Sequence, residues 1–460
     1  MRGLSSVLLL ASLMGLGCSS SSSNNNDGGG GAGGGGAAGS GGAGGGGGAG
    51  GSGGAGGGGG ASPISMLPDT SARIVPFADQ LDNGYSDKLV QFVATHFAGT
   101  QKMLKAENDR YRAVNPNWLL LHYRLGSSSG EVQYIHNDAW SSDWSDVTTH
   151  EDWFMHNMNG MRHHDAGSDW DINDISNSGF RDYWTTSVIA DMRATGAQGV
   201  FADSFEAGIS GYGVTDPDTR FDGTNPANAT LWPNGDTWIA QKHEWSAFVE
   251  AAFAATPEHF LFVPNIGAMI TGWADVDYSN VDGAMLEGFA YMEAPSDWAL
   301  GMNRAMKLTN AGKFIIVQSY PGGSGQQYVD ERDFLLGTYL LMKGAHTYIN
   351  LAGGGVYWFP EYALDFGAPK SALPADVSTY LASGVYERDF DKGVVLVNPS
   401  ASSVTVTLPS MMRLAQPSGG GATDDTQLDA SGNYTGGTVA FANVTSVTLA
   451  SRTAALLLNP

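Results

Sequence analysis

From about Ser71 onward, short apolar runs alternate with longer segments in which apolar residues recur at helical spacing. This alternation is typical of strand-helix units built around a parallel sheet. Eight runs have the length and composition of strands. In chain order they are Arg73 to Ala78, Gln91 to Phe97, Asn117 to Tyr123, Gly199 to Ala202, Phe260 to Pro264, Gly283 to Leu286, Phe314 to Gln318 and His346 to Asn350.

The amphipathic segments between these runs predict helices. The clearest are Thr100 to Val114, Asn177 to Thr195, Trp238 to Ala255 and Arg332 to Lys343. Pro116 and Pro257 stand just beyond the first and third of these segments, where a residue that cannot continue a helix is expected. Eight alternations in about 280 residues match the size of a (β/α)8 TIM barrel, which we predict over residues 70–378. A doubly wound open sheet is the alternative architecture.

After Leu381 the apolar residues recur with a period of two, as in strands with one buried face. The predicted strands are Gly393 to Asn398, Ser403 to Leu408, Val439 to Ala442, Ser446 to Leu449 and Ala454 to Leu458. Short alternating strands joined by Gly, Asn and Ser indicate a small antiparallel β-sandwich over residues 380–460.

The N-terminal part has the layout of an export signal, expected over residues 1–18. Arg2 supplies a positive charge, Val7 to Leu16 form an apolar run, and Cys18 is the only cysteine of the chain. This arrangement resembles the lipobox of bacterial lipoproteins, in which the cysteine is the lipid attachment site, although Gly15 stands where Leu is usual. The alternative is an ordinary cleaved signal followed by an incidental cysteine.

Residues 19–66 are almost entirely Ser, Asn, Gly and Ala over most of their length, and predict a flexible tether without a packed core. The chain has 46 acidic and 23 basic residues, a formal net charge of −23. Because nucleic acids are bound by clustered Lys and Arg, this balance argues against a nucleic-acid partner. We expect an exported bacterial protein, lipid-anchored at the cell envelope or secreted, and a monomer.

Reactive groups in a TIM barrel lie at the carboxyl ends of the strands. Two strand candidates run directly into a carboxylate, Asp203 after the fourth and Glu287 after the sixth. Cleavage of a glycosidic bond needs such a pair, one group acting on the anomeric carbon and the other protonating the leaving oxygen. Alternatively, either residue caps a helix or forms an ion pair. Other polar residues near strand ends are expected to bind substrate, namely Asp79, His96, Arg124, Asn265 and Gln318.

The loop that follows the third strand is rich in aromatic residues, including Trp140, Trp153 and Trp170. Flat aromatic faces suit pyranose rings, so we expect Trp140, Trp170 and also Trp358 to contact sugar. The alternative is that these side chains anchor a long loop. The acidic stretch around Asp169 to Asp174 lacks the glycine of an EF-hand loop, and no phosphate-binding glycine loop follows a strand. We therefore expect no metal site and no cofactor.

Several segments resemble known families of (β/α)8 glycosyl hydrolases. Asn173 to Trp184 and Gly196 to Ser204 are similar to motifs found before and at the fourth strand of amylase-like and galactosidase-like barrels. Two positions differ from these motifs, because Ser178 replaces the usual Pro and Gln198 replaces the usual Asp.

The chain also resembles the endo-polygalactosaminidase-like family and hypothetical glycosyl hydrolase family 15. The end of the fifth strand, Val263 to Asn265, and the start of the C-terminal module, Tyr386 to Pro399, are similar to the latter in particular. The resemblance extends over most of residues 70–460. It implies a glycoside hydrolase in which Asp203 is the nucleophile or base and Glu287 is the acid.

Together, these features predict a glycosidase that acts on an extracellular polysaccharide or oligosaccharide through a pair of carboxylates. Two other hypotheses remain open at this point, because a fold does not determine a function. One is a lipoprotein that binds carbohydrate without cleaving it. The other is a surface protein in which the tether matters more than any site.

Overall fold

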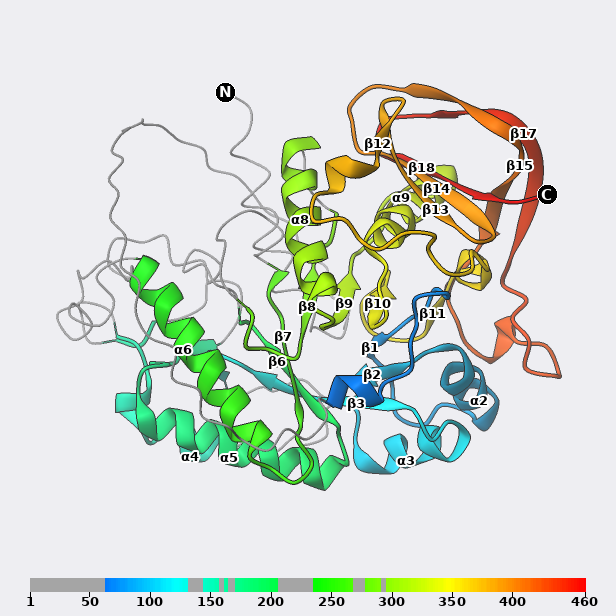
Figure 1. Cartoon of the computed structure of the whole chain (residues 1–460). Helices are drawn as coiled ribbons and strands as arrows, with labels where there is room; N and C mark the ends of the chain where they lie inside the picture. The colour runs from blue at the N-terminus through cyan, green and yellow to red at the C-terminus, as the bar shows by residue number, and fades with distance from the viewer. Residues whose placement is uncertain are drawn as a thin grey trace, which may run out of the picture.

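The computed structural model describes residues 63–130, 144–156, 161–163, 170–205, 235–267, 278–290 and 295–460. A mixed α/β region with parallel strands is followed by an antiparallel sheet near the C-terminus (Figure 1). In the described ranges, no helix is both long and apolar enough to cross a membrane.

Eight strands of the described α/β region run parallel to their neighbours. They are β1 (Ala78–Gln80), β2 (Gly99–Gln101), β3 (Leu119–Leu125), β6 (Gly199–Asp203), β7 (Leu261–Pro264), β8 (Gly283–Glu287), β9 (Phe314–Gln318) and β10 (Thr347–Asn350). The first five form one sheet in the order β1-β2-β3-β6-β7, and the last three form a second sheet in the order β8-β9-β10. Strand order therefore follows chain order throughout.

Backbone contacts connect the edges of these two sheets. An isolated parallel bridge joins Asn265, just after β7, to Met285 of β8, and another joins Pro76, just before β1, to Ile349 of β10. The amide of Phe77 also donates a hydrogen bond to the carbonyl of Ile349 at 3.0 Å. Both edges of the five-stranded sheet thus contact the three-stranded sheet.

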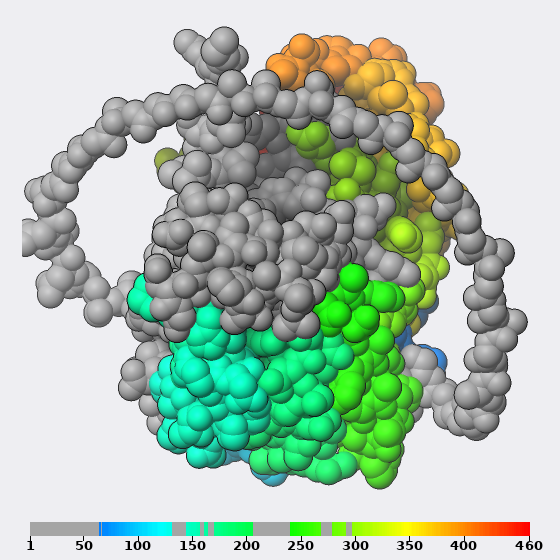
Figure 2. Space-filling model, turned by 90° about the vertical axis from the view of Figure 1, so that its left-hand side faces the viewer, coloured from blue at the N-terminus to red at the C-terminus, as the bar shows by residue number. Residues whose placement is uncertain are grey.

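Helices alternate with these strands along the chain. They are α2 (Asp87–His96), α3 (Lys105–Val114), α4 (Trp144–Val147), α5 (Ser178–Thr195), α6 (Gly235–Ala254), α8 (Pro295–Asn310) and α9 (Gln326–Met342). Two are capped by the expected side chains, since Ser86 accepts a hydrogen bond from the amide of Leu89, and Asn177 accepts from the amides of Gly179 and Phe180. Helices α5 and α6 lie side by side and form much of the surface in Figure 2.

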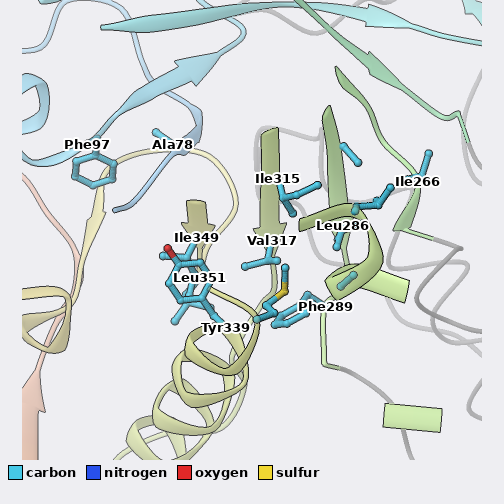
Figure 3. Close-up of a cluster of buried hydrophobic side chains, with 14 of the residues drawn as sticks. Ala78, Phe97, Ile266, Leu286, Phe289, Ile315, Val317, Tyr339, Ile349 and Leu351 are labelled. Carbon is cyan, nitrogen blue, oxygen red and sulfur yellow. The ribbon is translucent and has the colours of Figure 1, made fainter. Parts of the chain in front are cut away.

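Along each parallel strand, alternate side chains point toward the helices, and the others point to the opposite side of the sheet. In β9, Ile315 and Val317 belong to the large hydrophobic cluster that includes Tyr339 of α9 (Figure 3). Phe314 and Ile316 alternate with them and belong to a second, smaller cluster. This second cluster also contains apolar residues of β3, β6, β7, β8 and β10. Side chains on this face of the different strands therefore point toward one another and pack in the smaller cluster.

The two strands that carry the predicted carboxylates both begin with glycine, Gly199 in β6 and Gly283 in β8. A Cβ atom at Gly199 would lie 2.4 Å from the carbonyl oxygen of Leu261, and one at Gly283 would lie 2.3 Å from that of Phe314. Only glycine allows the neighbouring strand to approach so closely. Because side chains alternate along a strand, Asp203 and Glu287, four residues after these glycines, lie on the same strand face as the glycines.

The C-terminal strands form a single six-stranded sheet in the order β12-β13-β14-β18-β15-β17. Their bounds are β12 (Leu381–Ala382), β13 (Val385–Phe390), β14 (Gly393–Asn398), β15 (Val404–Gly419), β17 (Gly437–Leu449) and β18 (Thr453–Leu458). Residues such as Val395 and Leu456 join the large cluster beneath α9, whereas Val394 and Leu457 form a separate cluster on the other face. The predicted sandwich is thus observed as one antiparallel sheet with two buried faces.

Short strand pairs complete the described part. Strands β4 (Ser128–Gly130) and β5 (Trp170–Ile172) form an antiparallel pair, and β4 lies just beyond the end of β3. Strand β11 (Tyr357–Trp358) pairs with β16 (Gly421–Ala422), which connects the segment after β10 to the C-terminal region.

The prediction of a second strand over Gln91 to Phe97 was wrong, because this segment belongs to helix α2. Leu89, Val90, Phe92, Val93 and Ala94 are all buried, so the helix presents a nearly continuous apolar run. A run of this length does not distinguish a strand from a buried helix. The true strand β2 covers Gly99–Gln101, so the predicted helix that began at Thr100 begins instead at Lys105.

Candidate active site

Near the carboxyl end of each of the eight parallel strands, one polar side chain lies on the strand face that also carries the second, smaller hydrophobic cluster. These residues are Asp79, Gln101, Tyr123, Asp203, Asn265, Glu287, Gln318 and Asn350. Because the strands are parallel, their carboxyl ends lie on the same side of the strand layer. Hydrogen bonds connect several of these side chains directly, among them Asn265 to both Asp203 and Glu287.

The two predicted catalytic carboxylates are joined by one amide. The Nδ2 atom of Asn265 donates to Oδ1 of Asp203 at 2.9 Å and to Oε2 of Glu287 at 2.8 Å. The Oδ1 atom of Asn265 accepts a hydrogen bond from the amide of Gly267 at 3.2 Å, which fixes the orientation of the side chain. The two carboxylate oxygens can therefore be no farther apart than the sum of the two hydrogen bonds to Nδ2.

Asp203 accepts hydrogen bonds on both of its oxygens. The hydroxyl of Tyr123 donates to Oδ2 at 2.8 Å, and the backbone amide of Ser204 donates to Oδ1 at 2.9 Å. Ser204 has a φ of 51°, in the left-handed region that residues other than glycine rarely adopt. Such strain is concentrated at functional sites, where the surrounding structure holds a side chain in a particular position.

Glu287 is half-buried and has a partner on each oxygen. The hydroxyl of Tyr320 donates to Oε1 at 2.5 Å, opposite the bond from Asn265 to Oε2. Burial and the nearby negative charge of Asp203 raise the pKa of Glu287 to about 7, although the hydrogen bonds from Tyr320 and Asn265 oppose this shift. A carboxyl group with this pKa is still substantially protonated near neutral pH, as a general acid must be.

Asp79 is a third carboxylate close to this pair, and it is buried. Its Oδ1 accepts hydrogen bonds from Nε2 of Gln101 and from Nζ of Lys102, the latter at 3.2 Å. Lys102 also lies over the ring of Tyr123, with Nζ 4.7 Å from the ring centre, and it has a φ of 60°. The charge of Asp79 contributes to the raised pKa of Glu287, which places all three carboxylates within electrostatic reach of one another.

Residues 112–394, more than half of the chain, match the model of hypothetical glycosyl hydrolase family 15. The chain belongs to this family. It is a glycosidase, and both Asp203 and Glu287 lie within the matched segment. No curated protein matches the chain.

Several solved structures are similar to this chain at low identity. They include Amy13B of Eubacterium rectale, with 10% identity, a TM-score of 0.40 and coverage of 84% of this chain and 94% of that one. A noncanonic maltogenic α-amylase, AmyB of Thermotoga neapolitana, has 10% identity, a TM-score of 0.40 and coverage of 85% and 99%. An Anoxybacillus α-amylase has 10% identity, a TM-score of 0.39 and coverage of 85% and 98%. At these scores, the similarity identifies no substrate.

The structure brings together five of the residues predicted for the site: Asp79, Asp203, Asn265, Glu287 and Gln318. Gln318 donates from Nε2 to the hydroxyl of Tyr320 at 2.5 Å, so it reaches Glu287 through that side chain. Its Oε1 accepts a hydrogen bond from Nδ2 of Asn350 at 2.9 Å.

Arg124 does not join this group. It belongs to the other parity of β3, and its Nη1 lies 3.9 Å from Oδ2 of Asp191 on α5. Leu125 and Tyr123, its neighbours in β3, belong to the interior cluster. The prediction chose the polar residue nearest the strand end, whereas strand alternation selects Tyr123.

His96 and Trp358 lie together but apart from the carboxylates. His96 is the last residue of α2, and its ring stacks on Phe92 and meets the edge of Trp358. Helix α2 leads into the amino end of β2, so His96 lies on the side opposite the strand ends that carry the carboxylates. Both side chains line a cavity of about 380 Å³ beside the C-terminal sheet.

Trp170 of β5 is buried, with an exposed fraction of 7%, and belongs to the same hydrophobic cluster as Tyr123. Trp153 is equally buried and packs against Phe180 of α5. Burial of this extent favours the interpretation that these aromatic residues anchor their loop. Trp140 and the predicted lipid attachment site Cys18 lie outside the described residues.

One group of residues with metal-ligand chemistry is found in the described part of the chain. Glu250 of α6, His259 and Asp282 each place one possible ligand atom within 4.8 Å of the others. His259 precedes β7 and Asp282 precedes β8, so the group lies at the amino ends of the strands, away from Asp203 and Glu287. It was not predicted from the sequence.

Four residues of the candidate site were also missed by the sequence analysis: Gln101, Lys102, Tyr123 and Tyr320. Tyr123 and Gln101 could have been predicted from the alternation of side chains, because every second residue of a strand lies on the same face as its buried apolar residues. Tyr320 lies two residues beyond the end of β9 and has no comparable signal, because the course of a loop is not encoded in a simple period.

Proposed function

We propose that this glycosidase cleaves O-glycosidic bonds of an extracellular polysaccharide or oligosaccharide with Asp203 and Glu287, and that it retains the anomeric configuration. The observation that carries the proposal is the amide of Asn265, which donates to both carboxylates at 2.9 and 2.8 Å. Two oxygens that share one donor nitrogen are closer than the roughly 6.5 to 9.5 Å between the carboxyl groups of inverting enzymes. Their spacing suits a retaining enzyme, in which one carboxylate attacks the sugar directly.

The hydrogen bonds support different roles for the two groups. Asp203 accepts from Tyr123, Ser204 and Asn265, which stabilise it as an anion able to attack the anomeric carbon. Glu287, with its pKa raised to about 7, gives its proton to the leaving oxygen as the bond to that carbon breaks. The products of this step are a glycosyl ester on Asp203 and an ionised Glu287.

The second step reverses these roles. Glu287 takes a proton from a water molecule, the water oxygen bonds to the anomeric carbon, and the ester bond to Asp203 breaks. The released sugar has the configuration of the original bond, because the carbon has been displaced twice. Both carboxylates return to their starting states.

Asp79, Gln101 and Lys102 suit the recognition of sugar hydroxyl groups. All three are buried, and Oε1 of Gln101 has no hydrogen-bond partner among the described residues. A buried acceptor without a partner is unfavourable, so a ligand hydroxyl that donated to it would remove this penalty. The neighbouring carboxylate and ammonium of Asp79 and Lys102 could bind further hydroxyls in the same way.

The arrangement of the whole chain fits this proposal. The two parallel sheets, joined through Asn265 to Met285 and Pro76 to Ile349, would form the closed (β/α)8 barrel predicted from the sequence, with the C-terminal sheet as a sandwich-like module. Export and lipid attachment at Cys18, with residues 19–66 as a tether, would bring the enzyme to extracellular carbohydrate.

The test is hydrolysis by residues 63–460, compared with the full-length protein, on a panel of plant, algal and bacterial polysaccharides. Reducing-end release identifies the substrate class, and proton NMR of the first product identifies its anomeric configuration. We expect retention, with kcat/KM falling as the pH rises through the pKa of Glu287 near 7. An inverted first product would refute the retaining mechanism and the role of Asp203 as nucleophile.

A further inference from the structure

We propose that Tyr320 is a positioning residue that holds Glu287 with its acidic proton on Oε2, the oxygen on the Asp203 side of the carboxyl group. This inference rests on the proposed role of Glu287 as general acid. The phenol is the end of a chain of hydrogen bonds that begins at a backbone carbonyl and passes through two side-chain amides.

The direction of this chain is set at Asn350. Its Nδ2 atom donates to the backbone carbonyl of Ala352 at 2.8 Å and to Oε1 of Gln318 at 2.9 Å. A carbonyl can only accept, so the atom of Asn350 that faces Ala352 must be its nitrogen. That nitrogen carries two hydrogens, and the second one is directed to Gln318.

The orientation of Gln318 follows from this contact. Because its oxygen faces Asn350, its nitrogen faces Tyr320 and donates to the phenol oxygen at 2.5 Å. Tyr320 has one hydroxyl hydrogen, and with Gln318 as its donor it directs this hydrogen to Oε1 of Glu287 at 2.5 Å. Burial and the charge of Glu287 raise the pKa of Tyr320, so the phenol remains protonated.

This order of donors leaves Oε1 of Glu287 as an acceptor. Oε2 accepts a hydrogen bond as well, from Asn265, but at 2.8 Å it is longer than the 2.5 Å bond from the phenol to Oε1. In a protonated carboxyl group the carbonyl oxygen is the better acceptor, so the shorter bond assigns Oε1 as the carbonyl oxygen and Oε2 as the atom that carries the proton. Asn265 connects the same oxygen to Asp203, so Oε2 is the atom on the side of the proposed nucleophile. A glycosidic oxygen above Asp203 would meet the protonated oxygen rather than the one turned toward Tyr320.

The arrangement gives Tyr320 two effects that a purely structural residue would lack. Its hydrogen bond stabilises the ionised form of Glu287, which forms when the leaving group departs. It also limits rotation of the carboxyl group, and catalytic groups displaced by about 1 Å can lose about 100-fold in rate. Neither effect requires Tyr320 to touch the substrate.

The first experiment is Tyr320→Phe, which removes the hydroxyl and keeps the ring. We expect kcat to fall about 10- to 100-fold with little change in KM, because the loss is in orientation of the acid rather than in substrate binding. The alkaline limb of the kcat profile should move to higher pH, since the hydrogen bond that lowers the pKa of Glu287 is lost. Tyr339→Phe is the matched control, because its buried hydroxyl donates to the carbonyl of Thr347 at 2.8 Å, away from the carboxylates.

Titration of Glu287 provides a readout that needs no substrate. Carbon-13 NMR of labelled glutamate carboxyl groups, assigned by comparison with Glu287→Gln, should show a higher pKa for Glu287 in Tyr320→Phe than in the wild type or Tyr339→Phe. Gln318→Leu, which keeps Tyr320 but removes its donor, should shift this pKa in the same direction by a smaller amount. A larger shift in Gln318→Leu than in Tyr320→Phe would show that the chain does not act through Tyr320.

The outcomes separate this inference from the proposed function. An inactive wild type, or full activity in Glu287→Gln, would refute the role of Glu287 itself. An active wild type and inactive Glu287→Gln, together with a wild-type pH profile and kcat in Tyr320→Phe, would overturn only the role of Tyr320. Loss of rate combined with the alkaline shift in Tyr320→Phe, and neither in Tyr339→Phe, would support it.

Discussion

Two pairs of crowded carboxyl groups lie at opposite ends of the same parallel strands. Asp203 and Glu287 lie at the carboxyl ends of β6 and β8, whereas Glu250 and Asp282 lie at the amino ends, beside His259. Burial and a neighbouring carboxylate raise the pKa of Glu287 to about 7 and that of Glu250 to about 8, and burial also raises the pKa of Asp282. A raised pKa alone therefore does not distinguish a catalytic pair from a structural one.

The difference lies in the donors around each pair. At the carboxyl ends, Asn265 bridges the two groups while Tyr123 and Tyr320 each hold one of them. At the amino ends, Asp282 accepts a hydrogen bond from the backbone amide of Phe262 at 3.0 Å, and Glu250 places one oxygen within 4.8 Å of an oxygen of Asp282. Besides the shared amide, each group of the first pair has a tyrosine donor of its own, so the two groups can take different roles on a substrate. In the second pair, burial raises the pKa of both groups, and the charge of Asp282 raises that of Glu250 further.

The comparison is tested most strongly by the same substitution at both ends. Asp203→Asn removes the proposed nucleophile, and we expect a fall in kcat on the order of 10⁴-fold, as when one member of a catalytic unit is lost. Asp282→Asn should keep kcat within about twofold, because its amide oxygen can still accept from Phe262. Steady-state rates on the polysaccharide identified by the screen are the measurement. Equal losses in the two variants would mean that the difference in donors has no functional meaning.

A smaller effect is expected when the bridge is removed and both carboxylates remain. Asn265→Ala deletes the amide that holds Asp203 and Glu287 together, and we expect kcat to fall about 100- to 1,000-fold, the usual result of removing one preorganised donor. The pKa of Glu287 should rise as well, since this hydrogen bond lowers it.

Asn280→Ala is the control for this substitution. Asn280 lies near the amino-end pair and donates from Nδ2 to the carbonyl of His243 at 3.3 Å. It should lose little activity because it contacts neither carboxylate of the proposed site. If Asn265→Ala retained the wild-type rate and pH profile, the bridge could not be the feature that makes the carboxyl-end pair catalytic.

The sequence was sufficient to predict the strands that carry the candidate site, and the reason is physical. β6, β8 and β9 are continuous apolar runs that are buried on both faces, and each runs directly into a polar residue. The carboxylates of β6 and β8 could be found because a charge at the end of such a strand has few other places to lie. β2 has only three residues, Gly99–Gln101, and the apolar face of α2 gave a stronger strand-like signal beside it.

Within the site, the limit of prediction was the direction of each side chain. Arg124 is the more strongly polar of two adjacent residues in β3, but it faces Asp191 while Tyr123 faces Asp203. Alternation along the strand contains this information, because Leu119 and Leu121 share the parity of Tyr123. Tyr320 and the amino-end pair depend on loops and on residues far apart in the chain, and no local pattern would reveal them.

The smallest expected effect concerns stability and separates the two pairs without any substrate. The pKa of Glu250 in the folded protein is about 8, above the value of about 4.5 expected in the unfolded chain. The folded state therefore binds more protons between these values, and its stability falls as the pH rises from about 4.5 to 8. Glu250→Gln removes this titration and keeps a group that can donate to Asp282.

We expect Glu250→Gln to unfold with nearly the wild-type free energy at pH 5 and to be more stable than the wild type at pH 8.5 by roughly 1 to 3 kcal/mol. Urea unfolding of residues 63–460 at both pH values measures this difference, and activity should remain unchanged because Glu250 contacts no residue of the proposed site. A variant less stable than the wild type at pH 8.5 would indicate that an ionised Glu250 has a partner of opposite charge. The amino-end pair would then resemble an ion-binding cluster, and its difference from Asp203 and Glu287 would lie in what it binds rather than in its hydrogen-bond donors.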